Sequence, residues 1–162
     1  INKANTFCIL EDVALEAWLM LQKEAKEKGY DIDIDSAYRS AQRQAELIQI
    51  FTEKYGEERA KEIVAPPGTS EHQTGLSFDL DIYIDGNPLN SKDFYNVYKE
   101  LEFVHQNCHK YGFVLRYPKG KEEETEYPYE PWHLRYVGDL AEYLYSNNLT
   151  LDEYYKMNIK KG

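Results

Sequence analysis

Four side chains that could bind and use a metal ion fall in two short stretches of the chain. Residues 70–79 (SEHQTGLSFD) contain His72 and Asp79, and residues 130–133 (EPWH) contain Glu130 and His133. Hydrolytic zinc sites use three ligands from His, Asp, Glu or Cys and leave a fourth position to water. Zinc lowers the pKa of that water to about 7, and a nearby carboxylate takes its proton. We therefore expect His72, Asp79 and His133 to bind one zinc ion and Glu130 to act as the base.

Each of these residues also has an ordinary interpretation. A single histidine in a loop is commonly a solvated or hydrogen-bonded side chain, and Asp79 and Glu130 are two of 29 acidic residues. Their joint setting favours the site, because His72 lies between a PPG break at 66–68 and a predicted strand. Pro131 biases Glu130 toward an extended conformation, so Glu130 enters the next strand in a defined direction.

The other two histidines are weaker candidates for metal binding. His105 and His109 are four residues apart in a predicted helix, a spacing that can bring two side chains together. Neither belongs to the His-Glu-x-x-His arrangement of helical zinc proteases. We interpret both as structural or solvated side chains.

Periodicity predicts the elements that position the two stretches. Apolar residues at helical spacing predict helices over 11–29, 41–55, 57–64 and 91–111, followed by two C-terminal helices, of which the last opens with the capping box TLDE at 150–153. Strands are predicted over 31–35, 76–84, 113–117 and 132–137. In strand 76–84 the even-numbered residues are apolar, so Asp79 lies on the opposite, open face. Helix 91–111 carries the clearest apolar stripe, namely Phe94, Val97, Leu101, Val104, Cys108 and Tyr111.

These elements predict an α+β fold. We expect a small, mainly antiparallel sheet with helices packed on one face and the zinc site on the other. The chain has 162 residues and shows no repeat or linker, so we expect one domain over residues 1–162.

Composition excludes some partners. The net charge of −10 disfavours nucleic acid and anionic membrane surfaces, since both need a basic face. No apolar run reaches the ~18 residues of a membrane-spanning helix, and no signal peptide is present in this fragment. Because the chain begins at Ile1 and not at Met, we expect a processed product, which is compatible with a removed N-terminal anchor. Cys8 and Cys108 could form one disulfide or remain two free thiols.

Four segments resemble the LAS metallopeptidases, which include lysostaphin-type enzymes, D-Ala-D-Ala metallopeptidases and the hedgehog domain. Residues 70–79 match the SxHxxGxAxD motif, and EPWH at 130–133 matches ExxH in the ExWH form of VanY-type carboxypeptidases. SAYRS at 36–40 resembles (G/A)YRS, and GFVLRYP at 112–118 resembles GFxLRYP. The resemblance covers about residues 30–155. In one departure, Ser77 stands where the family usually has alanine, and this serine could alter the hydrogen bonding of Asp79.

The resemblance implies the same zinc ligands, the same base and further substrate-binding residues. Arg39 matches an arginine that binds the substrate carboxylate or stabilises the oxyanion, and arginine suits either role because its bonds to carboxylates are paired and charge-assisted. Gln44 and Ser70 match positions that hold the terminal residue of the substrate. The alternative for Arg39 is an ion pair with Asp33 or Asp35, and for Gln44 it is a solvated position on a helix. We also expect Arg116 and Arg135 to pair with acidic residues and brace the strands of the site.

By this resemblance the expected function is a zinc carboxypeptidase that removes the terminal D-alanine from a peptidoglycan stem peptide or precursor, a reaction linked to antibiotic resistance. The motifs leave D,D- and L,D-specificity open. Two alternatives are a peptidoglycan endopeptidase of the same fold and a zinc-containing binding module without activity, although Glu130 argues against the latter. We expect a monomer at the cell surface or in the cell wall, with a cytoplasmic precursor-trimming enzyme as the alternative.

Overall fold

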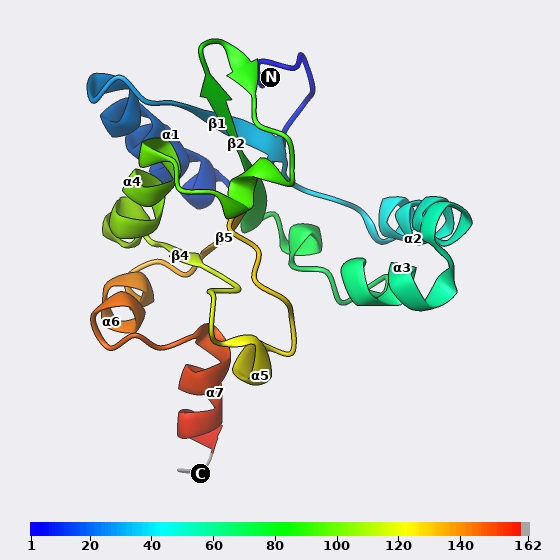
Figure 1. Ribbon diagram of the computed structural model, residues 1–162. Coiled ribbons are helices and arrows are strands. Elements are labelled where there is room, and N and C mark those ends of the chain that lie inside the picture. The colour runs from blue at the N-terminus through cyan, green and yellow to red at the C-terminus, as the bar shows by residue number, and fades with distance from the viewer. Residues whose placement is uncertain (160–162) are drawn as a thin grey trace.

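The structure is a computed structural model that describes residues 1–159, apart from the side chains of residues 62 and 63. Figure 1 shows strands in the middle of the molecule with helices around them. The helices and 3-10 turns are α1 (Asp12–Glu27), α2 (Ala41–Tyr55), α3 (Glu57–Ile63), η1 (Glu71–Thr74), η2 (Asp93–Tyr95), α4 (Lys99–Asn107), η3 (Cys108–Tyr111), α5 (Glu122–Thr125), α6 (Leu140–Ser146) and α7 (Leu151–Ile159). The strands are β1 (Asp31–Ser36), β2 (Ser77–Ile84), β3 (Asn87–Pro88), β4 (Phe113–Leu115) and β5 (His133–Tyr136).

The sheet has the order β1-β2-β5-β4, with β3 as a short hairpin partner of β2. Its pairs are antiparallel, which confirms the predicted α+β class with a small antiparallel sheet. The register pairs Asp79 on β2 with Ser36 on β1 on one side and with His133 on β5 on the other. Two residues from the separate motifs thus become cross-strand neighbours.

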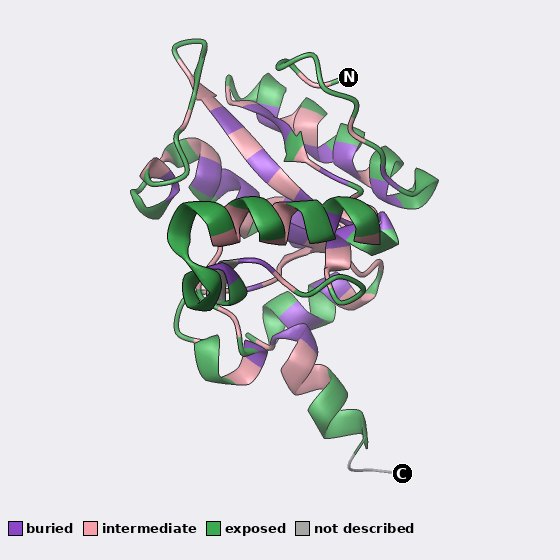
Figure 2. Cartoon of the chain, turned by 90° about the vertical axis from the view of Figure 1, so that its right-hand side faces the viewer, coloured by how far each residue is buried: buried purple, intermediate pink, exposed green. Residues whose placement is uncertain are grey.

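The hydrophobic core lies between the sheet and α1 and α4, which cover the same face in Figure 1. Trp18 of α1 packs edge-on against Phe78 of β2 with ring centroids 4.9 Å apart, and Phe78 meets Phe113 of β4 at 5.4 Å. Buried and half-buried residues alternate along most of β2, as Figure 2 shows in purple and pink. The alternation leaves Asp79 half-buried on the face opposite the core, as predicted.

Helices α2 and α3 form a pair that projects beside the sheet (Figure 1). Ser40 caps α2, because its hydroxyl accepts from the Arg43 amide at 3.2 Å. The outer side of α2 is exposed in Figure 2, and Gln44 is the fully buried residue of this helix. Of the residues at helical spacing that predicted this helix, Ala41, Ile48 and Thr52 are half-buried, whereas Ala45 is exposed.

The predicted helix 91–111 is wrong over its first part. Residues 93–95 form η2, Asn96 and Tyr98 have extended backbone, and α4 begins only at Lys99. Val97, which belonged to the predicted stripe, is 82% exposed. Phe94 is buried for a different reason, since its ring packs against Trp132 with centroids 6.0 Å apart.

Three further observations concern the segment before β5, the two cysteines and the length of the helices. The segment between β4 and β5 contains the short helix α5. Cys8 and Cys108 are free thiols, and burial raises the pKa of the Cys108 thiol to about 12. Within residues 1–159 no helix has both the length and the apolar character that crossing a membrane requires.

Candidate active site

His72, Asp79 and His133 converge, and each offers one ligand atom to a group whose members lie within 4.8 Å of one another. Asp79 Oδ1 is 3.2 Å from His133 Nδ1 and 3.4 Å from His72 Nε2. In a tetrahedral site with bonds of about 2.1 Å, neighbouring ligand atoms are about 3.4 Å apart. The donor types and the spacing therefore fit a metal ion bound by these three residues.

The two imidazoles are oriented by atoms outside this group. His72 lies in η1, and its Nδ1 is 2.7 Å from the Ala37 carbonyl oxygen. Because a carbonyl only accepts, Nδ1 carries the proton and Nε2 presents a lone pair toward Asp79. In His133 the nitrogens have the opposite roles: Nδ1 faces Asp79, while the buried Nε2 lies 3.5 Å from Glu71 Oε2 without a hydrogen-bond partner among the described residues.

Glu130 stands at the entrance to β5, beside the same group. Its Oε2 is 3.6 Å from His133 Nδ1, and its side chain is 20% exposed. The backbone fixes this position, because the Glu130 amide donates to the Tyr117 carbonyl at 3.1 Å and the His133 amide donates to the Glu130 carbonyl at 3.3 Å. Burial raises the pKa of Glu130 to about 7, the charges of Asp79 and Glu71 add to this rise, and His133 and His72 oppose it.

The charges in the group depend on one another. Burial alone would raise the pKa of Asp79, but its contacts with the rings of His133 and His72 hold it well below its usual range. Burial opposes protonation of His133, yet its hydrogen bond to Asp79 and the nearby carboxylate of Glu71 raise the pKa of its ring to about 9. A bound cation would take the place of these protons, since metal binding and protonation compete for the same lone pairs.

Arg39 lies beside the metal-binding group. Its Nη2 is 3.9 Å from Asp79 Oδ2 and donates to Ser36 Oγ at 3.0 Å, while Nη1 donates to Gln44 Oε1 at 3.1 Å. The Arg39 side chain is 19% exposed. The carboxylate that pairs with Arg39 here is Asp79, neither of the two that the sequence suggested.

The other two predicted substrate-binding residues, Gln44 and Ser70, differ in burial and in their contacts. Gln44 is 2% exposed, and its amide is engaged at both ends, by Arg39 and by the Ala65 carbonyl at 2.7 Å. Its contacts therefore hold Arg39 in place, and it is not the solvated helix residue of the alternative. Ser70 is half-buried at the start of η1, and its side chain makes no capping hydrogen bond there.

Glu71 is a site residue that the sequence interpretation missed. Its Oε1 accepts from Arg116 Nε at 2.8 Å and lies 3.7 Å from Arg135 Nη1, and its Oε2 accepts from Ser77 Oγ at 3.3 Å. Burial disfavours its charge, but the contacts with His133 and Arg116 lower the pKa of Glu71 to about 2. The expected bracing by Arg116 and Arg135 is confirmed, whereas Ser77 bonds to Glu71 and not to Asp79. The sequence did hold a signal for Glu71, since it directly precedes the candidate ligand His72. Arg116 and Arg135 were also expected to pair with acidic residues that had not been named.

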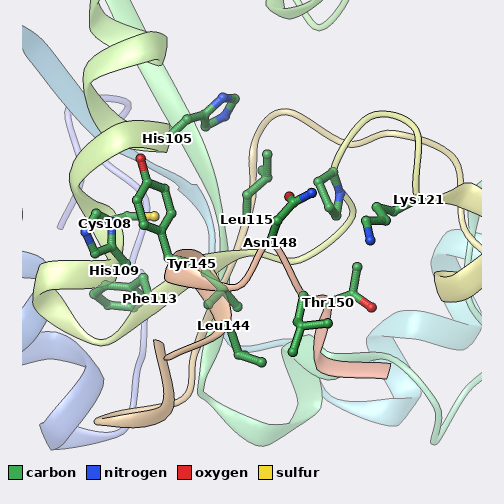
Figure 3. Close-up of a pocket in the computed structure, with 13 residues that line it drawn as sticks. His105, Cys108, His109, Phe113, Leu115, Lys121, Leu144, Tyr145, Asn148 and Thr150 are labelled. Atoms are coloured by element: carbon green, nitrogen blue, oxygen red, sulfur yellow. The ribbon is translucent and has the colours of Figure 1, made fainter. Parts of the chain in front are cut away.

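A groove of about 380 Å³ adjoins Asp79. Its walls include the aromatic rings of Tyr83, Phe94 and Trp132 and the carboxylates of Asp35, Asp79 and Asp81. A second pocket, of about 190 Å³, is shown in Figure 3. It is lined from α4, η3, β4 and the connection between α6 and α7, and so lies apart from the groove beside Asp79.

Comparison with known proteins identifies the family. The family model described as VanY, D-alanyl-D-alanine carboxypeptidase, matches residues 8–139. The chain belongs to the VanY family. Among its relatives, YodJ of Bacillus subtilis (strain 168) is 44% identical over 149 residues, which are 91% of this chain and 54% of that protein. The chain thus spans about half the length of that curated relative.

Solved structures of VanY-type proteins show the same fold. The LdcB LD-carboxypeptidase is 42% identical and superposes with a TM-score of 0.81 over 91% of this chain and 68% of that chain. A variant of the vancomycin-resistance D,D-pentapeptidase VanY in complex with Zn(II) is 30% identical, with a TM-score of 0.77 over 90% of this chain and 83% of that chain. VanY-family relatives thus include an LD- and a DD-enzyme, so membership alone leaves the bond that this chain cleaves undecided.

Proposed function

We propose that this chain is a zinc-dependent carboxypeptidase that removes the terminal D-alanine from peptidoglycan stem peptides or their precursors. The observation that carries the proposal is a carboxylate, Glu130, that lies 3.6 Å from a nitrogen of the metal-binding group. A binding module has no need of a buried carboxylate at that place. His72, Asp79 and His133 are the proposed zinc ligands, and the Zn(II) complex of the VanY relative supports the choice of metal.

When bound, zinc would supply Lewis acidity that polarises the scissile carbonyl and acidifies water. Glu130 takes the proton of the attacking water and delivers it to the leaving amine. Its pKa of about 7 in the metal-free site reflects burial beside other carboxylates, and groups with a pKa near the working pH suit both steps.

Arg39 binds the substrate at the other side of the scissile bond. Its exposed guanidinium edge pairs with the free carboxylate of the last residue, and Gln44 and Ser36 hold its other donors. Ser70 contacts that last residue. The groove beside Asp79 receives the part of the peptide that precedes the bond, with Trp132 as an aromatic wall. Because the requirement for a chain end rests on Arg39, removal of one terminal residue fits this site better than internal cleavage. We infer from the substrate an extracytoplasmic place of action.

The test uses pentapeptide and tetrapeptide stems, with product masses as the readout. We expect loss of one alanine from one stem, loss of this activity on chelation, and its return with one equivalent of zinc. Glu130→Gln should lower kcat by at least about 100-fold while metal content stays unchanged. If neither stem loses alanine, the carboxypeptidase proposal is wrong. Unchanged hydrolysis by Glu130→Gln would remove Glu130 from the mechanism.

A further inference from the structure

His105 makes a short hydrogen bond to the segment that carries Glu130 and His133. It lies in the last turn of α4, and its Nε2 is 2.8 Å from the Pro131 carbonyl oxygen. Figure 3 shows His105 on α4, about one turn before Cys108 and His109. Because the Pro131 oxygen only accepts, Nε2 is the nitrogen that carries the proton. Burial lowers the pKa of the His105 ring, so at neutral pH this is its single proton.

The accepting carbonyl occupies a special place in the backbone. Proline fixes its own φ near −65°, so ψ of Pro131 is the one soft backbone dihedral at the residue that follows Glu130. The direction of the Pro131 carbonyl reports that dihedral directly. A donor that holds the carbonyl therefore sets how Glu130 is turned relative to Trp132 and His133.

The neighbouring peptide groups of this segment are held by backbone. The Glu130 amide donates to the Tyr117 carbonyl, and the Trp132 carbonyl accepts from the Leu80 amide at 2.8 Å. Pro131 lies between these two bonds with its own side chain fully buried. The side chain of His105 thus bonds to the carbonyl of Pro131, and the residues on either side of Pro131 are held by backbone hydrogen bonds.

We propose that His105 is a positioning residue for the reaction: by donating to the Pro131 carbonyl, it fixes the direction of the Glu130 carboxylate toward the metal-binding group. This inference rests on the proposed function of Glu130 and extends it to a residue outside the VanY-like motifs. His105 touches neither substrate nor metal in this role. Its effect on the rate comes from orientation, where misplacement by about 1 Å can cost 100-fold.

The deciding comparison is His105→Gln against His105→Met. Gln carries an N–H the same number of bonds from Cα as His Nε2, whereas Met has similar length and helix propensity but no donor. We expect kcat of His105→Met to fall about 10-fold with KM within twofold of wild type, because Arg39 and the groove are unchanged. Gln should restore kcat to within about threefold. Both variants should bind zinc as wild type does.

The matched control is the same pair of substitutions at His109. That ring lies one turn later, is 8% exposed, stacks on Tyr145 with centroids 3.7 Å apart, and has its Nε2 3.4 Å from Glu142. His109→Gln and His109→Met should differ little from each other in kcat. Equal losses in the two Met variants would show a general effect of the helix and overturn the proposal.

Two further results would overturn it. One is a folded His105→Met protein with kcat within twofold of wild type, and the other is a loss of kcat that Gln does not restore. Nitrogen-15 spectra of labelled histidine give an activity-independent readout, since a proton on Nδ1 instead of Nε2 would contradict the hydrogen bond. If wild type itself removes no alanine from either stem, the proposed function fails as well, whereas an active wild type with an unaffected His105→Met rejects this inference alone.

Discussion

At the scale of single residues, Arg39 is the group whose role is easiest to separate from folding. Its side chain is 19% exposed, its guanidinium lies 3.9 Å from Asp79, and under the proposed function it binds the substrate carboxylate. For Arg39→Met we expect kcat/KM to fall 100-fold or more on a stem peptide with a free C-terminus. Wild type should discriminate strongly against the same peptide with a C-terminal amide, and the variant should lose that discrimination.

Arg43 on α2 supplies the control for this measurement. It is 55% exposed and pairs with Glu46 on the helix surface. Arg43→Met should leave kcat/KM for both peptides within about twofold of wild type. If Arg39→Met still prefers the carboxylate peptide as strongly as wild type does, another group binds the chain end.

The sequence predicted the main residues of the candidate site but not their supports. Alternation along the predicted strands selected Asp79 on β2 and His133 on β5, and the position between the PPG break and β2 selected His72. Glu71 was missed, since its importance comes from Arg116, directly after β4, and Arg135 on β5. Such contacts depend on the strand order, and periodicity carries no information about that order.

Among the elements, α7 is joined to the site by one ion pair. Asp152 in its first turn binds the Arg116 guanidinium through both oxygens, and Arg116 in turn donates to Glu71. Asp152→Asn weakens this link but leaves Arg116 its bond to Glu71. We expect the free energy of unfolding to fall by about 1–2 kcal/mol, or Tm by about 5 °C, with faster amide exchange across 151–159.

The ion pair of Glu57 and Lys61 on α3 provides the comparison, because both side chains are more than 60% exposed. Glu57→Gln should leave Tm unchanged within error, since exposed pairs contribute little. Unchanged exchange in α7 of Asp152→Asn would show that its packing and the capping box at Thr150 hold this helix without Asp152.

The elements themselves were predictable where local spacing decides them, and the error at 91–98 shows the limit. Phe94 and Val97 have the spacing of a helical stripe, but Phe94 is buried by Trp132, which lies 38 positions further along the chain. A tertiary contact of this kind overrides propensity. It also leaves Val97 in solvent, where a continued helix would have directed it to the core.

At the scale of the whole molecule, the buried carboxyl group of Glu130 lowers the free energy of unfolding of the metal-free protein at neutral pH. The pKa of Glu130 is about 7 in the folded, metal-free protein, above the value near 4.3 of an unfolded chain. A raised carboxyl pKa contributes stability that is fully present below pH 4 and is lost as pH rises through 7. Glu130→Gln has no proton to lose and escapes this cost.

In the presence of a chelator, therefore, Glu130→Gln should gain stability over wild type between pH 5 and pH 8. The expected gain is on the order of 2 kcal/mol, after allowance for the partial exposure of the side chain. Urea unfolding at the two pH values measures it. Parallel pH profiles would show that burial does not raise the pKa of Glu130.

Two contacts of His72 bear on how many residues the proposed carboxypeptidase would remove from the end of its substrate. Its ring Nδ1 is bonded to the Ala37 carbonyl at 2.7 Å, and its own carbonyl accepts from the Arg39 amide at 3.1 Å. These two bonds join the backbone at Ala37 and Arg39 to His72, so a proposed metal ligand and the residue proposed to bind the chain end are held beside each other. Under the proposed function, the distance between the proposed metal ligands and Arg39 matches one residue of the substrate. A substrate with one more residue beyond the scissile bond would carry its carboxylate past Arg39. The backbone contacts between residues 37–39 and 72 would therefore limit the released product to a single residue.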